Sequence, residues 1–344
     1  MIDLSTSRKR VRAWLGAVLL TSAGIPVLGG FTTSRAVFRA NGDGSGVEQV
    51  IPSNVAEGRG PLTADQQHLY WGGGFAVQDA AWIRRSDLDG NNVQDILGPG
   101  DFTDMKVDSQ NAKLYFTTVA DCSPGCGSIT RINLDGSNYE MLFSADAPGT
   151  IAIYPPEDLV CWWDVDGIVC GTVGDDAGQV VVSDSAVGLA IDPLQQKLYW
   201  TASDRIRRSN LDGSGIEDLV LGLDSPKGIV LDPLGNWMWW TERILGKIQR
   251  AHLNGSNVQD IVRGLDSPTG IGFVPAPVAG PIDKIYWVSS APPEGEDVPT
   301  ASVRGLVSLT LLLLAVSSIF GHSAFYTGRS WQGGSQTNEK CPSK

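Results

Sequence analysis

Histidine is scarce in this sequence, which argues against the many catalytic and metal sites that depend on it. Only three occur among 344 residues, at His68, His252 and His322, and their positions do not form a cluster. No Ser–His–Asp order, phosphate-cradling glycine loop or metal-ligand spacing stands out. We therefore predict no catalytic residue, no bound metal and no cofactor.

Positive charge is also in short supply. The chain has 26 lysine and arginine residues against 38 aspartate and glutamate residues, a formal net charge of −12. No run of basic residues occurs outside the N-terminus. Because nucleic-acid binding requires a basic patch, this composition excludes a nucleic-acid partner.

A helical period is missing from the stretch between Gly188 and Ile271, which instead contains one pattern twice, with Trp200 and Trp240 at equivalent places. Each copy has four short runs rich in β-branched or aromatic residues and separated by Asp-Gly or Gly-Leu-Asp-Ser-Pro turns. In the first copy these runs are 188–192, 197–201, 206–211 and 216–221. Four short strands repeated at about 40 to 45 residues are typical of a β-propeller blade.

The same residues resemble a known repeat. Tyr199-Trp200-Thr201, Ile206 with Arg208, Leu211-Asp212-Gly213, and Gly228-Ile229 before Asp232-Pro233 are similar to the low-density-lipoprotein-receptor class B, or Y-W-T-D, repeat. The resemblance implies an all-β fold, a six-bladed propeller with four-stranded antiparallel blades.

Six second strands can be counted along the chain. The tryptophan position is occupied by Trp71, Phe116, Trp162, Trp200, Trp240 and Trp287, and the preceding position by Tyr70, Tyr115, Cys161, Tyr199, Trp239 and Tyr286. Because neighbouring side chains of a strand point to opposite faces, each pair should pack toward two different neighbouring blades. We expect these aromatic residues to form the core between blades.

The third-strand pattern is missing after Trp287 but is present before the first blade, around Arg39. We therefore predict that residues 37–51 complete the last blade and close the ring, which removes free sheet edges. One arginine recurs in the third strands, as Arg39, Arg85, Arg131, Arg208 and Arg250. We expect these arginines to bond to aspartate or carbonyl groups across blades.

An aspartate recurs at the end of the first strand, as Asp65, Asp108, Asp192 and Asp232. We interpret it as a turn cap that pairs with the repeated arginine. The alternative is that these carboxylates converge on the channel, where they hold a cation or catalyse.

The two ends of the chain differ in composition from the repeats. Residues 1–30 have a basic start and a short apolar run, which predicts a signal peptide with a hydrophobic helix. The propeller takes residues 37–290, followed by a polar linker (291–303), a second hydrophobic helix (304–321) and a short polar tail (322–344). The 298–320 stretch resembles the bacterial IPTL-type sorting tail, which implies a membrane-associated protein of the cell envelope, anchored or released at the cell surface.

Five cysteines remain to be explained in a chain predicted to be exported. Cys122 and Cys126 flank a Ser-Pro-Gly turn, which predicts a small loop disulfide. Cys161 and Cys170 should lie opposite each other on a hairpin, which predicts a cross-strand disulfide. Cys341 is left over, and the sequence assigns it no role.

Function follows from this reading by analogy only. The favoured hypothesis is a non-enzymatic, monomeric module that binds a protein or glycan ligand and associates with the membrane through its C-terminal helix. The alternatives are a propeller hydrolase or lyase with a central divalent cation, and a structural envelope protein. Convergent, non-repeated polar groups in the channel would favour the enzyme, whereas a broad exposed aromatic patch would favour protein binding.

Overall fold

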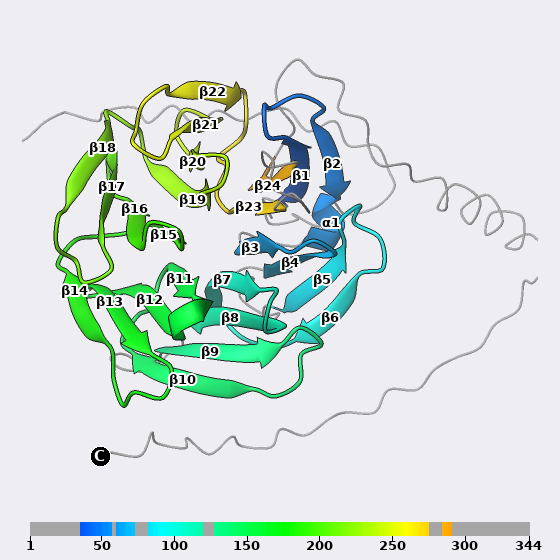
Figure 1. Ribbon diagram of the computed structural model, residues 1–344. Helices are drawn as coiled ribbons and strands as arrows, with labels where there is room; N and C mark the ends of the chain where they lie inside the picture. The colour runs from blue at the N-terminus through cyan, green and yellow to red at the C-terminus, as the bar shows by residue number, and fades with distance from the viewer. Residues whose placement is uncertain (1–34, 57–59, 73–81, 120–126, 275–283, 291–344) are drawn as a thin grey trace, which may run out of the picture. The chain divides into compact units, whose positions relative to one another are not determined.

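The computed structural model describes residues 35–56, 60–72, 82–119, 127–274 and 284–290, which belong to the chain's second compact unit, Ser34–Lys344. Twenty-four strands form six separate four-stranded antiparallel sheets arranged around a common centre (Figure 1). The predicted six-bladed propeller is confirmed.

The blades follow one another along the chain. The first contains β3 (Leu62–Ala64), β4 (His68–Gly72), β5 (Ile83–Asp87) and β6 (Gln94–Leu97). The second contains β7 (Phe102–Asp108), β8 (Lys113–Thr118), β9 (Gly127–Asn133) and β10 (Glu140–Ala145). The third contains β11 (Ile151–Tyr154), β12 (Leu159–Asp164), β13 (Gly167–Thr172) and β14 (Gln179–Val182).

The remaining blades repeat this order. The fourth contains β15 (Gly188–Asp192), β16 (Lys197–Thr201), β17 (Arg205–Asn210) and β18 (Glu217–Leu221). The fifth contains β19 (Pro226–Asp232), β20 (Trp237–Glu242), β21 (Lys247–His252) and β22 (Gln259–Val262). The sixth joins β23 (Ile271–Val274) and β24 (Lys284–Ser289) to β1 (Ala36–Asn41) and β2 (Glu48–Ile51), so the predicted ring closure is confirmed.

The prediction of one hydrophobic helix near each end is corrected. The helical elements of the described residues are the one-turn α1 (Ser53–Ala56) and a 3-10 turn at Pro155–Glu157. No helix in these ranges is long and apolar enough to cross a membrane. The stretches 1–30 and 304–321, to which those helices were assigned, lie outside the described residues.

The core consists of six apolar clusters, one at each interface between blades. Each cluster combines the tryptophan-position residue of one blade with the preceding-position residue of its neighbour. The pairs are Trp71 with Tyr286, Phe116 with Tyr70, Trp162 with Tyr115, Trp200 with Cys161, Trp240 with Tyr199, and Trp287 with Trp239. All twelve side chains are buried. The period-2 argument is therefore confirmed, and these residues hold neighbouring blades together.

The repeated arginines also connect blades. Arg39, Arg85, Arg208 and Arg250 each donate a hydrogen bond to a turn carbonyl of the next blade, at Leu88, Leu134, Leu253 and Gly42. Arg131 instead bonds Glu140 and Tyr115 of its own blade, because the third blade lacks the Leu-Asp-Gly turn. The expected carbonyl partners are confirmed for four of the five. The expected pairing with the first-strand aspartates is wrong: the side-chain partners are fourth-strand residues such as Glu48, Glu217 and Gln259.

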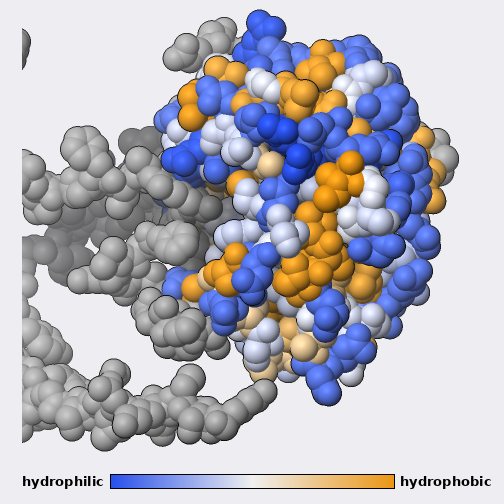
Figure 2. Space-filling model, turned by 90° about the vertical axis from the view of Figure 1, so that its left-hand side faces the viewer, coloured by the Kyte–Doolittle hydropathy of each residue, from blue (hydrophilic) through white to orange (hydrophobic). Residues whose placement is uncertain are grey.

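The outer side of the ring mixes apolar and polar residues. Figure 2 shows the side that carries β17 and β18, where hydrophobic residues form separate patches between hydrophilic ones. Among the described residues the exposed large aromatic side chains are Trp82 and Tyr139, which belong to different blades. The ranges that the structure describes therefore carry no broad aromatic patch of the kind expected for protein binding.

Candidate ligand pocket in the central channel

A cavity of about 490 Å³ lies where the six first strands begin. The strands β3, β7, β11, β15, β19 and β23 surround the centre of the ring (Figure 1), and residues from all six blades line this cavity. The register aligns six triplets at this end of the strands. They are Gly60-Pro61-Leu62, Thr103-Asp104-Met105, Gly149-Thr150-Ile151, Val187-Gly188-Leu189, Lys227-Gly228-Ile229 and Thr269-Gly270-Ile271.

Part of the wall is apolar and rigid. Leu62, Leu189, Ile229 and Ile271 form the aliphatic floor of the cavity, and because they are almost fully buried they present only a small surface to it. Each belongs to an inner strand whose position is set by the apolar clusters between blades. This floor can receive an apolar surface without rearrangement.

Glycine lets the inner strands approach one another at the start of β15 and β19. A Cβ atom at Gly188 would lie 2.4 Å from the carbonyl oxygen of Lys227, and one at Gly228 would lie 2.9 Å from Ile271. Gly270 has more room, because the nearest atom to its Cβ position is 3.4 Å away. The small residues therefore set the spacing of the strands around the cavity.

Of the described residues one carboxylate lines the cavity, and both of its oxygens accept hydrogen bonds. Asp104 Oδ2 accepts hydrogen bonds from Lys106 Nζ (2.9 Å), Thr150 Oγ1 (2.8 Å) and the Ile151 amide (3.0 Å). Its Oδ1 accepts one from the Met105 amide at 2.8 Å. Asp104 thus joins the second blade to the third and neutralises Lys106, so it offers little to a further cation.

Lys227 is the second charged residue at the strand starts. Its ammonium is half-buried, and none of the described side chains or carbonyls accepts a hydrogen bond from it. Burial, and then the positive charge of Arg243, lower the pKa of Lys227 below its ordinary value. Lys227, one of the residues that line the cavity, therefore carries a charge that has lost part of its hydration and has no hydrogen-bond acceptor among the described residues.

Trp163 replaces a repeated threonine in the cavity wall. In three blades the threonine after the tryptophan position, Thr117, Thr201 or Thr241, donates a hydrogen bond to a carbonyl of the next first strand. The third blade has Trp163 there, half-buried, lining the cavity and packed against Gly149. A hydrogen bond of the scaffold is thus exchanged for an aromatic surface.

The sequence-predicted aspartates are not part of this cavity. Asp65, Asp108, Asp192 and Asp232 stand at the other end of the first strands, and each accepts hydrogen bonds from the amides of its own following turn. The turn-cap interpretation is confirmed, and the four carboxylates do not converge. Within the described ranges no three His, Cys, Asp or Glu side chains gather closely enough to hold a metal ion.

The sequence analysis missed Asp104, Lys106, Trp163 and Lys227. The signal was available in the repeat alignment. Each of the six aligned triplets has two positions before its buried apolar residue. Lys227 and Asp104 are the only charged residues at these twelve positions. These four residues depart from the repeat, and all four line one cavity.

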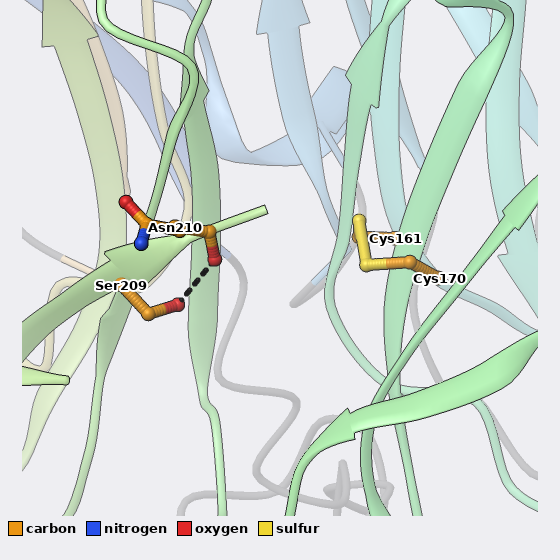
Figure 3. The surroundings of a disulfide bond; sticks show 4 residues. All are labelled: Cys161, Cys170, Ser209 and Asn210. Atoms are coloured by element: carbon orange, nitrogen blue, oxygen red, sulfur yellow. Dashed lines mark hydrogen bonds between the residues drawn. A yellow bond between two sulfur atoms is a disulfide. The ribbon is translucent and has the colours of Figure 1, made fainter. Parts of the chain in front are cut away.

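The predicted disulfide between Cys161 and Cys170 is present, joining β12 to β13. Figure 3 shows it with Ser209 and Asn210 of β17 in its surroundings, and both cysteines belong to the apolar cluster shared with the fourth blade. The other predicted pair, Cys122 and Cys126, lies outside the described residues.

Fold and site together define a six-bladed β-propeller with a cavity in its central channel. No protein-family model matches the chain, and no curated protein sequence matches it either.

Solved structures match through their fold. A chain of a nidogen/laminin complex has a TM-score of 0.54 at 17% identity, covering 66% of this chain and 92% of that one. A TolB-like protein of Agrobacterium tumefaciens has a TM-score of 0.61 at 12% identity, covering 75% and 99%. A gluconolactonase of Xanthomonas campestris has a TM-score of 0.51 at 16% identity, covering 68% and 87%. At these identities the similarity establishes the propeller fold alone.

Proposed function

We propose that this protein is a non-enzymatic binding module that holds a small ligand in its central cavity. The observation that carries the proposal is the convergence of non-repeated residues, Asp104, Lys106, Trp163 and Lys227, on one cavity of about 490 Å³. Small-molecule sites are concave, have mostly apolar walls and contain a few placed polar groups. This cavity likewise combines an apolar wall with a few polar side chains, and those side chains stand at positions where the repeat has other residues.

Binding is favoured over catalysis because the polar side chains Asp104 and Lys106 are already hydrogen-bonded to each other. A general base or a metal ligand is most effective when its carboxylate is free, whereas Asp104 accepts three hydrogen bonds at Oδ2 and one at Oδ1, and it is paired with Lys106. Converging polar groups were our criterion for an enzyme, but those present are suited to holding a ligand. The lactonase among the similar folds keeps hydrolysis as the alternative to test.

Export from the cytoplasm belongs to the same proposal. The Cys161–Cys170 pair is the supporting observation, since structural disulfides persist in oxidising compartments. The ligand would then be a molecule of the cell envelope or its surroundings.

The test is a ligand screen by thermal shift on the full chain, repeated on two matched variants. Val187→Trp places a large side chain at a cavity-lining position, and Leu194→Trp makes a similar change at an exposed turn of the same blade. A ligand present at about 100 times its Kd stabilises the folded state by about 2.7 kcal/mol. Hits that persist in Leu194→Trp and disappear in Val187→Trp are expected.

Two outcomes would count against the proposal. Hits that survive in Val187→Trp would place binding elsewhere on the surface. Turnover of ester or lactone substrates, with divalent cations supplied and lost in Val187→Trp, would show that the cavity is an active site.

A further inference from the structure

Among the described residues, the charge balance of the cavity is opposite in sign to that of the whole chain. The chain has a formal net charge of −12, yet the charged residues of the described ranges that line the cavity are Asp104, Lys106 and Lys227. Lys106 and Asp104 compensate each other through a 2.9 Å ion pair. Within the part of the chain that the structure describes, one positive charge, that of Lys227, has no ion-pair partner.

Among the described residues, the Lys227 side chain has no hydrogen-bond or ion-pair partner in the scaffold. Its backbone carbonyl accepts the hydrogen bond from Thr201, as the equivalent carbonyls of Gly149 and Thr269 do from Thr117 and Thr241. The aligned residues of the other blades are Gly60, Thr103, Gly149, Val187 and Thr269, so the position tolerates small neutral side chains. A half-buried lysine here costs solvation free energy, and no described residue offsets that cost with a hydrogen bond or an ion pair to its ammonium.

We propose that the cavity binds a small organic anion, with a carboxylate at Lys227 and a flat apolar body against Trp163 and the aliphatic floor. This inference rests on the proposed function and names its ligand class. A carboxylate would accept hydrogen bonds from the Lys227 ammonium and supply a negative charge beside it, which together make a charge-assisted pair. The body replaces water at the half-buried Trp163 ring, which lines the cavity.

Arg243 supports the same sign of ligand. It is exposed, and it is close enough to Lys227 for its charge to lower the pKa of that residue. Two neighbouring cations repel each other, and an anion bound beside them relieves the repulsion. Arg243 should therefore favour the approach of an anion to an otherwise acidic protein.

The experiment measures the binding of three probes to the full chain by titration calorimetry. Benzoate has the charge and the flat body, benzamide has the same body without the charge, and inorganic phosphate has charge without the body. We expect benzoate to bind about tenfold or more tightly than either of the others.

Three variants assign the effect to one residue. Lys227→Met should weaken benzoate binding about tenfold to a hundredfold and leave benzamide unchanged, whereas Lys227→Arg should retain most of the affinity. Arg263→Met removes an exposed cation that does not line the cavity, and it should change nothing. A thermal melt of each variant checks that the fold is intact.

The outcomes separate this inference from the proposed function. Equal binding of benzoate and benzamide, both lost in Val187→Trp, would overturn the anion assignment and leave the binding cavity standing. Phosphate binding as tightly as benzoate would overturn the claim that the ligand needs a flat apolar body. No binding of benzoate would overturn the inference, while the ligand screen would still decide the proposed function.

Discussion

At the scale of single residues, the disulfide occupies the place of a repeated polar pair. In five blades the residue before the tryptophan position lies opposite the repeated arginine, as Tyr199 lies opposite Arg208. In the third blade the opposite residues are Cys161 and Cys170. Tyr199 and Arg208 both donate to the Leu253 carbonyl of the next blade, so that pair holds two blades together. The disulfide instead joins two strands of one blade.

The first prediction concerns this bond. Replacing both cysteines, Cys161→Ala with Cys170→Ala, should lower the free energy of unfolding by about 2–3 kcal/mol, because the cross-link closes a short loop of the unfolded chain. Denaturant unfolding under oxidising conditions measures the change. Cys341→Ala is the matched control, for which we expect none. An unchanged midpoint in the double variant would mean that the bond does not form in solution.

A second prediction at this scale concerns Lys227. Its lowered pKa means that the unfolded chain binds more protons than the folded one between the folded-state pKa and the ordinary value of 10.5. Stability therefore rises with pH across that window. Lys227→Met removes the burial of the charge, so it should stabilise the protein slightly at neutral pH, within about 1 kcal/mol. The difference from wild type should shrink as the pH approaches 10.5, in paired melts. A destabilised variant would give Lys227 a structural role.

At the scale of elements, the repeated arginine connects two neighbouring blades wherever the repeat is intact. It does so by a hydrogen bond to a turn carbonyl of the next blade. Arg85 donates to the Leu134 carbonyl of the next blade at 2.9 Å, while Arg131 has no bond to the third blade among the described residues. Arg85→Met should therefore lower the free energy of unfolding by about 1 kcal/mol more than Arg131→Met. Chemical denaturation of both variants tests this. Equal losses would show that the carbonyl bond adds nothing beyond the pairing within each blade.

The spacing of the inner strands can be tested by comparing alanine substitutions at two glycines that line the cavity. Gly188→Ala would place a methyl group 2.4 Å from the Lys227 carbonyl oxygen, so the strands must separate, at a cost of about 1–3 kcal/mol. Gly270→Ala meets its nearest atom at 3.4 Å, an ordinary contact, and should change stability by about 0.5 kcal/mol or less. Thermal melts of the two variants provide the measurement. A similar effect at both positions would contradict the strand spacing described here.

The elements could be predicted from the sequence because the information repeats. Strand period, Asp-Gly turns and the aromatic pairs recur in most of the blades, so an error at one position is corrected at the others. The cavity residues have the opposite property. Lys227, Asp104 and Trp163 each occur once, and their significance depends on strand register, which brings the starts of six strands together. A single sequence shows the departures but not that they meet.

At the scale of the whole molecule, the ring is closed by strands from the two ends of the described chain. Six residue pairs, from Ala36 with Ser289 to Asn41 with Lys284, join β1 to β24. Arg35 adds hydrogen bonds to Ser267 and Thr269 in the loop before β23. The sixth blade therefore forms only when the chain ends meet, which makes the propeller one cooperative unit.

Closure can be tested by moving the closing strands rather than only deleting them. A variant without residues 35–56 exposes the β24 edge and lacks about a third of the buried residues of two apolar clusters, so it should lose its cooperative unfolding transition and aggregate. A circular permutant that begins at residue 57 and carries residues 35–56 after Ser290 restores the same pairs, since Ala36 lies opposite Ser289. It should unfold within a few degrees of the full chain in a thermal scan. A cooperative transition in the deletion variant would show that five blades fold without the sixth. Failure of the permutant to fold would show that the order of the strands along the chain matters more than the pairing itself.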